Sequence, residues 1–332
     1  MAGSQRVYRA RVKSTQSLKK IFRAMELIAA SRIGRARAAA ARQRPYAAAL
    51  TRAVGLAAAH VGGEIRHPLL VERANVKRVA LLVLAADRGM AGAYTANVLR
   101  EAEAHAAELA EDGFEVDRYV VGRRALGYYD FRGVPVKRSW LGSSDSPTFP
   151  LAKDIATTLL AAFTAPASAP SAVGQLHVVY THFRNMVSQA PRMVRMLPLE
   201  LVADEADPAA DPAADPAADP AADPEAVTVV RERATGQTAK AEVFPLYSFE
   251  PSPLGVLDAL LPRYVRSRIL DFLLQAAASE LANRQRAMHT ATDNAEELVR
   301  KYTRLANQAR QADITQEISE IVSGADALAA GR

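Results

Sequence analysis

Apolar residues recur at alternating steps of three and four in two long segments, one near each end of the chain. Near the start these positions are Leu18, Ile21, Met25 and Ile28, and near the end they are Leu298, Tyr302, Leu305, Ala309 and Ala312. Residues 263–323 contain neither proline nor glycine, which predicts a helix about 90 Å long at 1.5 Å per residue. Because this spacing is typical of coiled-coil seams, we predict that the two terminal helices pair antiparallel through these residues.

The middle of the chain changes to short apolar runs separated by turns. Residues 79–86 are the longest such run and predict a strand buried on both faces. A turn with Gly89 and Gly92 follows, and then a helix to about Asp112. Further strands are predicted at 114–121, 134–140, 176–180 and 192–199, with helices near 123–131 and 151–163. This order predicts an open, mostly parallel sheet.

These patterns divide the chain into three parts. Residues 1–60 are expected to form the first long helix, residues 75–250 the α/β domain and residues 252–330 the second long helix. Ser252 and Pro253 are typical of an N-cap followed by a first helical position. Pro262 is expected to interrupt or kink the helix that they begin.

An acidic insertion at about 204–225 contains the repeat DPAADPAADPAADPAADP. Proline at every fourth position excludes a helix, and the segment offers little apolar surface to bury. We therefore predict a disordered surface loop. It is interpreted first as a tolerated insertion and second as a regulatory tether.

Charge is distributed unevenly along the chain. Residues 1–44 hold twelve Lys or Arg and one acid, Glu26, whereas residues 203–225 hold eight acids and no base. Such a basic segment is consistent with a solvated helix face, a nucleic-acid footprint or an arm fitted to a protein cavity.

The sequence has no cysteine, which excludes disulfides and thiolate chemistry. The longest apolar run is far shorter than the roughly 20 residues of a spanning helix, and the first residues lack a secretory apolar region. We expect a cytoplasmic protein that reaches membranes only through a partner.

Motifs for catalysis are missing from the sequence. It contains no GxxxxGK[ST] phosphate loop and no GxSxG elbow. The turn DRGMAGAY at 87–94 follows a strand and opens a helix, but it lacks the GxGxxG spacing that brings the backbone close to a pyrophosphate. It is therefore interpreted as a tight strand-to-helix turn in preference to a cofactor site. These observations favour a mechanical, scaffolding or binding role over an enzyme.

Histidines and acids also form no recognisable site. The six histidines show no HExxH or comparable ligand spacing. His177 and His182 flank a strand end and could approach each other, although surface histidines are the preferred interpretation. Glu296 and Glu297 are adjacent on a helix and so diverge.

Five segments resemble the gamma subunit of F-type ATP synthases: SLKKIFRAMELIAASRI, DRGMAGAY, YSFEPSPLGVLDALLPRYV, ATDNAEEL and ARQADITQEISEIVSGADAL. The resemblance brackets the whole chain, and ITQEISEIVSGA is its most specific part. It implies a central rotor subunit with a Rossmann-like domain and an antiparallel coiled coil of its terminal helices. It further implies no active site and no cofactor of its own, because catalysis lies on partner chains.

The implied partners are the alpha and beta subunits of the head, the epsilon subunit and the membrane c-ring. The implied location is peripheral, on the cytoplasmic face of a bacterial cell membrane. By matched motif positions, the resemblance implies contacts with the head at Met25, Arg284, Gln311, Thr315, Glu317 and Glu320. It implies foot contacts with the ring and epsilon at Tyr247 and Glu250. Ala91 stands where many relatives have cysteine, and the acidic insertion departs from the family pattern.

Two other functions remain open at this point. A basic helical scaffold that binds nucleic acid is suggested by the arginine-rich first 44 residues and would bind duplexes in a strongly salt-dependent way. A dehydrogenase built on the α/β domain would bind a nucleotide, and its missing fingerprint makes it the third choice.

Overall fold

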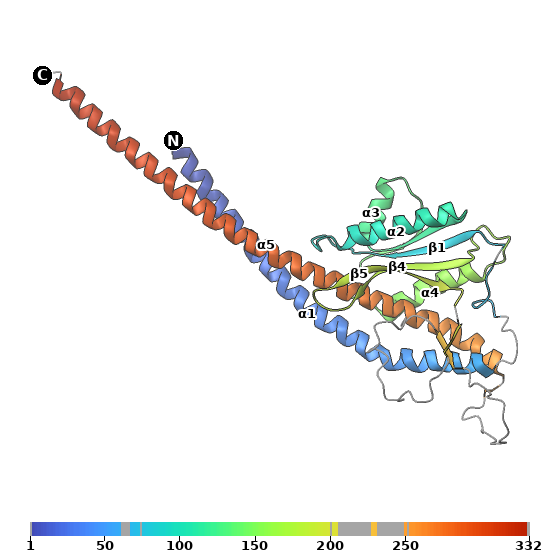
Figure 1. Cartoon of the computed structure of the whole chain (residues 1–332). Coiled ribbons are helices and arrows are strands. Elements are labelled where there is room, and N and C mark those ends of the chain that lie inside the picture. The colour runs from blue at the N-terminus through green and yellow to red at the C-terminus, as the bar shows by residue number, and fades with distance from the viewer. Residues whose placement is uncertain are drawn as a thin grey trace. The chain divides into compact units, whose positions relative to one another are not determined.

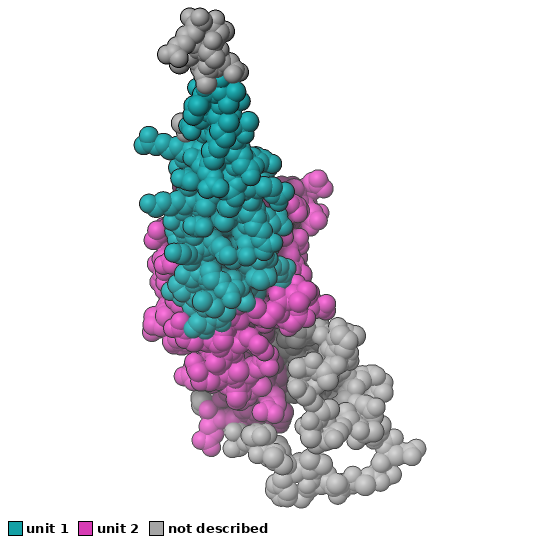
Figure 2. Space-filling model, turned by 90° about the vertical axis from the view of Figure 1, so that its left-hand side faces the viewer, with its two compact units in different colours: residues 1–32, 90–92, 281–332 teal, residues 33–89, 93–280 magenta. Residues whose placement is uncertain are grey.

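The computed structural model describes residues 2–60, 67–73, 75–199, 201–204, 227–230, 249–250 and 252–330. The chain divides into two compact units, coloured separately in Figure 2. Unit 1 comprises Met1–Arg32, Met90–Gly92 and Leu281–Arg332, and unit 2 comprises Ile33–Gly89 and Ala93–Glu280. Two long helices, α1 (Ala2–His60) and α5 (Pro253–Ala330), each contribute residues to both units. The predicted terminal helices are thus confirmed as elements.

Unit 2 contains a five-stranded sheet in the order β3-β2-β1-β4-β5. The strands are β1 (Arg78–Leu84), β2 (Glu115–Val121), β3 (Val136–Trp140), β4 (Gln175–Phe183) and β5 (Gln189–Leu197). The first four are parallel, and β5 pairs antiparallel with β4. The chain moves from β1 toward β3 and then returns to the other side of β1, so the sheet is doubly wound. The predicted open, mostly parallel sheet is confirmed.

Helices cover both faces of this sheet (Figure 1). They are α2 (Tyr94–Glu111) and α3 (Arg123–Phe131) on one face and α4 (Phe149–Thr164) on the other. The apolar run of β1 is buried on both faces because alternate side chains contact opposite layers. A second, parallel pair of strands, β6 (Leu201–Asp204) and β7 (Val227–Val230), flanks the acidic insertion. The predicted disordered loop itself lies outside the described residues between those two strands.

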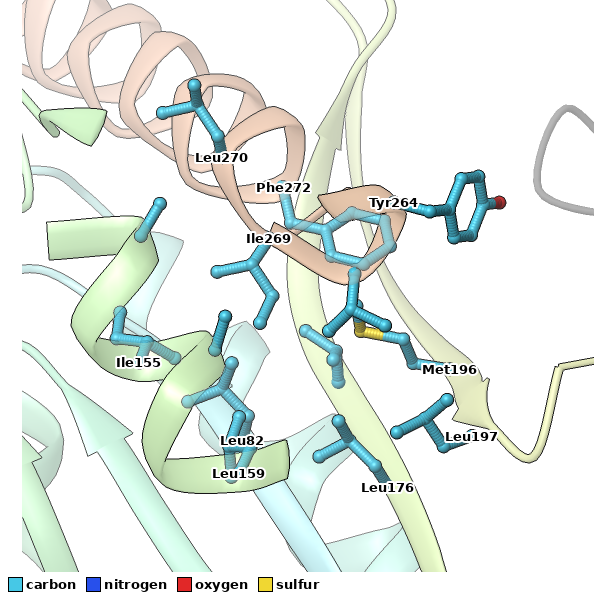
Figure 3. Close-up of a cluster of buried hydrophobic side chains, with 14 of the residues drawn as sticks. Leu82, Ile155, Leu159, Leu176, Met196, Leu197, Tyr264, Ile269, Leu270 and Phe272 are labelled. Atoms are coloured by element: carbon cyan, nitrogen blue, oxygen red, sulfur yellow. The ribbon is translucent and has the colours of Figure 1, made fainter. Parts of the chain in front are cut away.

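The main core of unit 2 forms where α4 and the first part of α5 meet the sheet. Figure 3 shows Ile155 and Leu159 of α4 beside Leu82 of β1, with Ile269 and Phe272 of α5 in the same cluster. All five side chains are almost completely buried. Burying a large apolar side chain stabilises a fold by about 1.5–3 kcal/mol. The first part of α5 is therefore an integral layer of the α/β unit.

The start of α5 follows the predicted capping chemistry. Ser252 Oγ accepts a hydrogen bond from Gly255 N at 3.1 Å, and Pro253 is the first helical residue. The expected interruption at Pro262 does not occur, because α5 continues through that residue. Leu261 and Val265, on either side of Pro262, are fully buried in the core. Tertiary packing therefore holds the helix together where the proline removes one backbone donor.

Candidate functional site

The carboxyl ends of the parallel strands are the place where doubly wound sheets bind ligands. Here Asp87, just after β1, occupies that position. Its Oδ1 accepts a hydrogen bond from Arg123 N at 3.1 Å and its Oδ2 accepts one from Ser144 N at 2.9 Å. Asp87 N in turn donates to Ser144 Oγ at 2.9 Å. One carboxylate therefore joins the loops that follow β1, β2 and β3.

The electrostatics of Asp87 agree with this role. Burial raises the pKa of the Asp87 carboxyl, but the N–H groups of Gly142, Ser144 and Arg123 and the Ser144 hydroxyl donate to it and lower the pKa below its ordinary value. Arg123 is the first residue of α3, where a dinucleotide-binding domain can offer free N–H groups to phosphate. In this chain that N–H already has a carboxylate partner. The turn 87–94 connects β1 to α2, as the sequence predicts.

Unit 1 pairs the first part of α1 with the later part of α5. Lys19 Nζ lies 3.1 Å from Glu296 Oε2, and His289 Nδ1 lies 3.2 Å from Glu26 Oε1. Because the numbering rises on α1 where it falls on α5, the two segments run antiparallel. The predicted orientation of the coiled coil is confirmed.

The predicted seam of α1 is wrong at three of its four positions. Leu18, Ile21 and Ile28 are exposed and Met25 is half-buried, whereas Glu26 and Ala29 are buried. The spacing of three and four residues is correct. However, the stripe of α1 that faces α5 lies on a different side of the helix from the stripe with the most apolar residues. Glu26 and Ala29 lie on the more buried side of α1 together with the half-buried Phe22 and Met25, while Leu18, Ile21 and Ile28 lie outside. Apolarity alone could not distinguish these two stripes, because both have coiled-coil spacing.

The seam predicted on α5 is correct in part. Tyr302, Leu305 and Ala309 are half-buried, while Leu298 and Ala312 are exposed. An additional contact is the guanidinium of Arg11, which lies 5.6 Å from the centre of the Tyr302 ring. This cation–π contact was not expected from the sequence.

Beyond its paired part, α5 extends past the N-terminal end of α1 (Figure 1). Every described side chain from Ile314 to Ser323 is exposed. Ile314, Ile318 and Ile321 have exposed fractions of 46, 56 and 71%, and their spacing places them on one face of the helix. We call these three isoleucines the tip stripe. Together with the exposed aliphatic residues of α1, which the sequence pattern had placed in the seam, they are candidates for contact with a partner.

The structure places the contact residues implied by the resemblance in three different environments. Gln311, Thr315, Glu317 and Glu320 are exposed on α5, and Met25 is half-buried on α1. Arg284 is only 6% exposed within the chain. Glu250 is exposed, whereas Tyr247 lies outside the described residues. The four exposed residues lie along the same stretch of α5 as the tip stripe.

Two of these residues have local partners on α5. Thr315 Oγ1 donates to Gln311 O at 2.9 Å, and Glu320 Oε1 accepts from Gln316 Nε2 at 2.9 Å. Such exposed contacts within one helix contribute little to stability. They leave these polar side chains able to exchange partners at a modest cost.

The interpretation of His177 as a surface histidine is wrong. His177 is buried, and its Nδ1 lies 2.6 Å from His105 Nε2. It does not approach His182, because residues five apart in one strand point to opposite faces of the sheet. The partner, His105, comes from α2 and could not be identified by spacing along the sequence.

Within the ranges that the structure describes, no group of three or more His, Asp or Glu side chains is placed to hold a metal ion. In that same part of the chain, no helix has the length and apolar character needed to cross a membrane.

Comparison with known proteins gives a consistent result over the whole length. The family model described as ATP synthase matches residues 4–328. The ATP synthase gamma chain of Beutenbergia cavernae is 57% identical over 330 residues, which cover 99% of this chain and 100% of that protein. The ATP synthase gamma chain of Acidothermus cellulolyticus is 50% identical over 330 residues, with 99% of each chain covered.

Solved structures share the fold at low sequence identity. A chain of the Euglena gracilis mitochondrial ATP synthase (OSCP/F1/c-ring, rotational state 3) matches with a TM-score of 0.61 at 15% identity, covering 100% of this chain and 96% of that one. A chain of the Tetrahymena thermophila mitochondrial ATP synthase (central stalk/c-ring) matches with a TM-score of 0.52 at 18% identity, covering 82% and 99%.

Proposed function

We infer the function from one premise: the chain belongs to the ATP synthase gamma chain family. We propose that it is the central rotor subunit of an F-type ATP synthase. In this role it couples proton-driven rotation of a membrane ring to the conformational cycle of catalytic subunits that make ATP. The chain itself acts without an active site, as a shaft whose changing contacts act on its partners.

The observation that carries this proposal is the construction of unit 1. Glu26 and Ala29 of α1 are buried, whereas the aliphatic side chains of Leu18, Ile21 and Ile28 and the tip stripe of α5 remain exposed. Contiguous exposed apolar surface marks a site of protein contact. A shaft that turns inside a protein sleeve requires this arrangement, because its outer surface must contact the sleeve while its inner seam stays closed.

The proposed partners are the alpha and beta subunits around the shaft, with the epsilon subunit and the c-ring at the foot. The structural neighbours support this assignment, since one belongs to an OSCP/F1/c-ring assembly and the other to a central stalk with its c-ring. The proposed location is peripheral, on the cytoplasmic face of a bacterial cell membrane. The shaft would be formed by residues 1–60 and 252–330, and residues 75–250 would form the domain outside the head.

The proposed head contacts are Met25, Arg284, Gln311, Thr315, Glu317 and Glu320. Exposed polar groups on a turning shaft can form hydrogen bonds or ion pairs at some angles and not at others. The burial of Arg284 suggests that this side chain acts by holding the helix pair in position. Tyr247 and Glu250 are the proposed foot contacts.

Co-purification tests the proposal directly. A tagged full-length chain expressed with its genomic alpha, beta and epsilon partners is expected to recover all three subunits from membranes in a complex that synthesises ATP. Mass spectrometry identifies the partners, and ATP synthesis in reconstituted vesicles measures coupling. Recovery of the chain without any of these subunits would overturn the proposal.

The basic first helix permits a direct test of the nucleic-acid alternative. The rotor function predicts only weak binding of duplex DNA that disappears at 200 mM salt, since exposed arginines attract any polyanion. Fluorescence anisotropy with a labelled duplex measures this binding. Tight sequence-independent binding at that salt concentration, with no recovery of head subunits, would favour the scaffold function.

Met25→Lys is expected to lower ATP synthesis about tenfold, because an ammonium group would be placed in an apolar contact at a cost of about 1–3 kcal/mol. ATP hydrolysis and proton pumping, measured in the same vesicles, show whether coupling is lost. Met25→Leu keeps the apolar surface and is the matched control. Equal synthesis rates for both variants in fully assembled complexes would contradict this placement of Met25.

A further inference from the structure

A chain of four polar side chains crosses the interface between α2 and the sheet of unit 2. Glu108 Oε2 lies 3.3 Å from His105 Nδ1, His105 Nε2 lies 2.6 Å from His177 Nδ1, and His177 Nε2 lies 2.9 Å from Gln175 Oε1. Both imidazoles are buried, and the two rings meet edge to edge, with their planes 26° apart and their centres 4.9 Å apart. We call these four residues the histidine relay. The proposed rotor function does not use it.

The surroundings of the relay are defined by every element packed against it. On β1, the neighbour of His177 is the apolar Leu81, and on β5 it is Arg195. Arg195 Nη1 lies 3.3 Å from Glu72 Oε1.

On the β2 side of α2, Glu103 is paired with Arg118 at 3.3 Å. Glu108 is therefore the carboxylate that contacts the histidines directly, and its side chain is 73% exposed. It places a negative charge beside the His105 ring at one end of the four residues.

The donors and acceptors of the relay are all matched when His105 carries two protons. Its Nδ1–H then donates to the Glu108 carboxylate and its Nε2–H donates to His177 Nδ1. His177 carries its proton on Nε2 and donates to the amide oxygen of Gln175. An ionised carboxylate can only accept, and so can an amide oxygen. With these two acceptors at its ends, the relay needs three protons on the two rings.

The donors and acceptors are also matched with one proton fewer. His105 then keeps only its Nδ1 proton, and its Nε2 accepts a hydrogen bond from His177 Nδ1–H. His177 Nε2 becomes an acceptor, so the Gln175 amide must turn and donate its NH2 group. The His105 Nε2 proton passes to His177 Nδ1, and the proton that is released is the one that His177 held on Nε2 beside the half-buried Gln175. The loss of this proton therefore moves the remaining proton of His177 from one ring nitrogen to the other.

We propose that His105 and His177 form a one-proton switch between α2 and β4, in which protonation of His105 sets the tautomer of His177. Burial, together with the nearby His105 and Arg195, lowers the pKa of His177 to about 3. His177 therefore remains neutral while the pair binds its one proton. The switch gives this α/β unit a direct response to pH that is independent of catalysis on partner chains.

The test is a histidine titration of the full-length chain labelled with ¹⁵N in its imidazoles. From pH 5 to pH 9, the two ring nitrogens of His177 are expected to exchange protonated and unprotonated chemical shifts in a single transition. Its midpoint should equal the midpoint for protonation of His105. Glu108→Gln should lower this shared midpoint by about half a pH unit, because an exposed carboxylate is partly screened by solvent.

Glu111→Gln is the matched control, since Glu111 is an exposed acid on the same helix and has no part in the relay. Its midpoint should equal that of the unmodified chain. The switch is refuted if the His177 tautomer stays constant while His105 titrates, or if neither ring changes over this pH range. Equal midpoints for the two glutamine variants would also refute it, because Glu108 would then not stabilise the protonated state.

Discussion

Gly122→Ala is expected to lower the free energy of unfolding by about 4 kcal/mol. Gly122 has φ +101° and ψ 135° at the entry to α3, a conformation that residues with a Cβ rarely adopt. An added Cβ would also lie 2.8 Å from Ala85 C and 2.9 Å from Ala86 C, and closer still to the carbonyl oxygen of Ala85. These are backbone atoms at the end of the central strand β1, so they cannot move aside cheaply. Urea denaturation monitored by circular dichroism measures the change.

Gly127→Ala is the matched control for this prediction. Gly127 lies within the same helix, and an added Cβ would meet no atom within 4 Å. Because alanine is a better helix former, this variant should gain about 0.5–1 kcal/mol. Similar changes in stability for the two variants would show that an added Cβ does not strain the backbone at Gly122.

Replacing the tip stripe with Ile314→Ser, Ile318→Ser and Ile321→Ser is expected to weaken binding to the alpha and beta subunits about 1000-fold. Covering three isoleucines that are exposed in the free chain stabilises the complex by about 4 kcal/mol, which corresponds to a factor of about 1000. Titration of labelled chain into a head assembled from alpha and beta subunits measures this affinity. Binding within threefold of the unmodified chain would contradict the assignment of the tip stripe to the sleeve.

The control for the tip stripe replaces polar side chains on the same helical turns. Gln316→Ala with Ser319→Ala removes exposed hydrogen bonds within the helix and keeps all three isoleucines. This double variant should bind the head nearly as well as the unmodified chain. Both sets of variants should unfold at nearly the same temperature as the unmodified chain, because each substituted residue is already exposed.

The elements of the fold could be predicted because they depend on local patterns. The spacing of apolar residues in both terminal segments and the absence of proline and glycine from residues 263–323 predict long helices, and α1 and α5 are those helices. The buried run at 79–86 predicts the central strand, and the predicted helix at 123–131 has the observed bounds of α3. Apolar residues at steps of three and four in both terminal segments also predicted that the two helices pair antiparallel. Each of these inferences needs only the spacing of residues within one or two elements.

The candidate contact surface could be predicted only in part. The seam of α1 was placed on Leu18, Ile21 and Ile28 because a coiled coil normally buries its most apolar stripe. The free chain exposes these residues and buries Glu26 and Ala29. The seam of α1 was mispredicted for a functional reason. Apolar residues of α1 that another subunit covers recur with the same spacing as apolar residues that α5 covers. The sequence of one chain does not distinguish the two partners.

By itself, the sequence determined the helical segments, the strands of the five-stranded sheet, the capping of α5 and the resemblance to one family. Only the tertiary structure decided which apolar stripe of α1 faces α5, and that Asp87 occupies the carboxyl edge of the sheet. Only the tertiary structure brings His105 to His177. The reason is that local conformation depends on neighbours within a few residues, whereas burial and hydrogen bonding depend on groups that meet through the fold. His105 and His177 are 72 positions apart, and no spacing rule connects them.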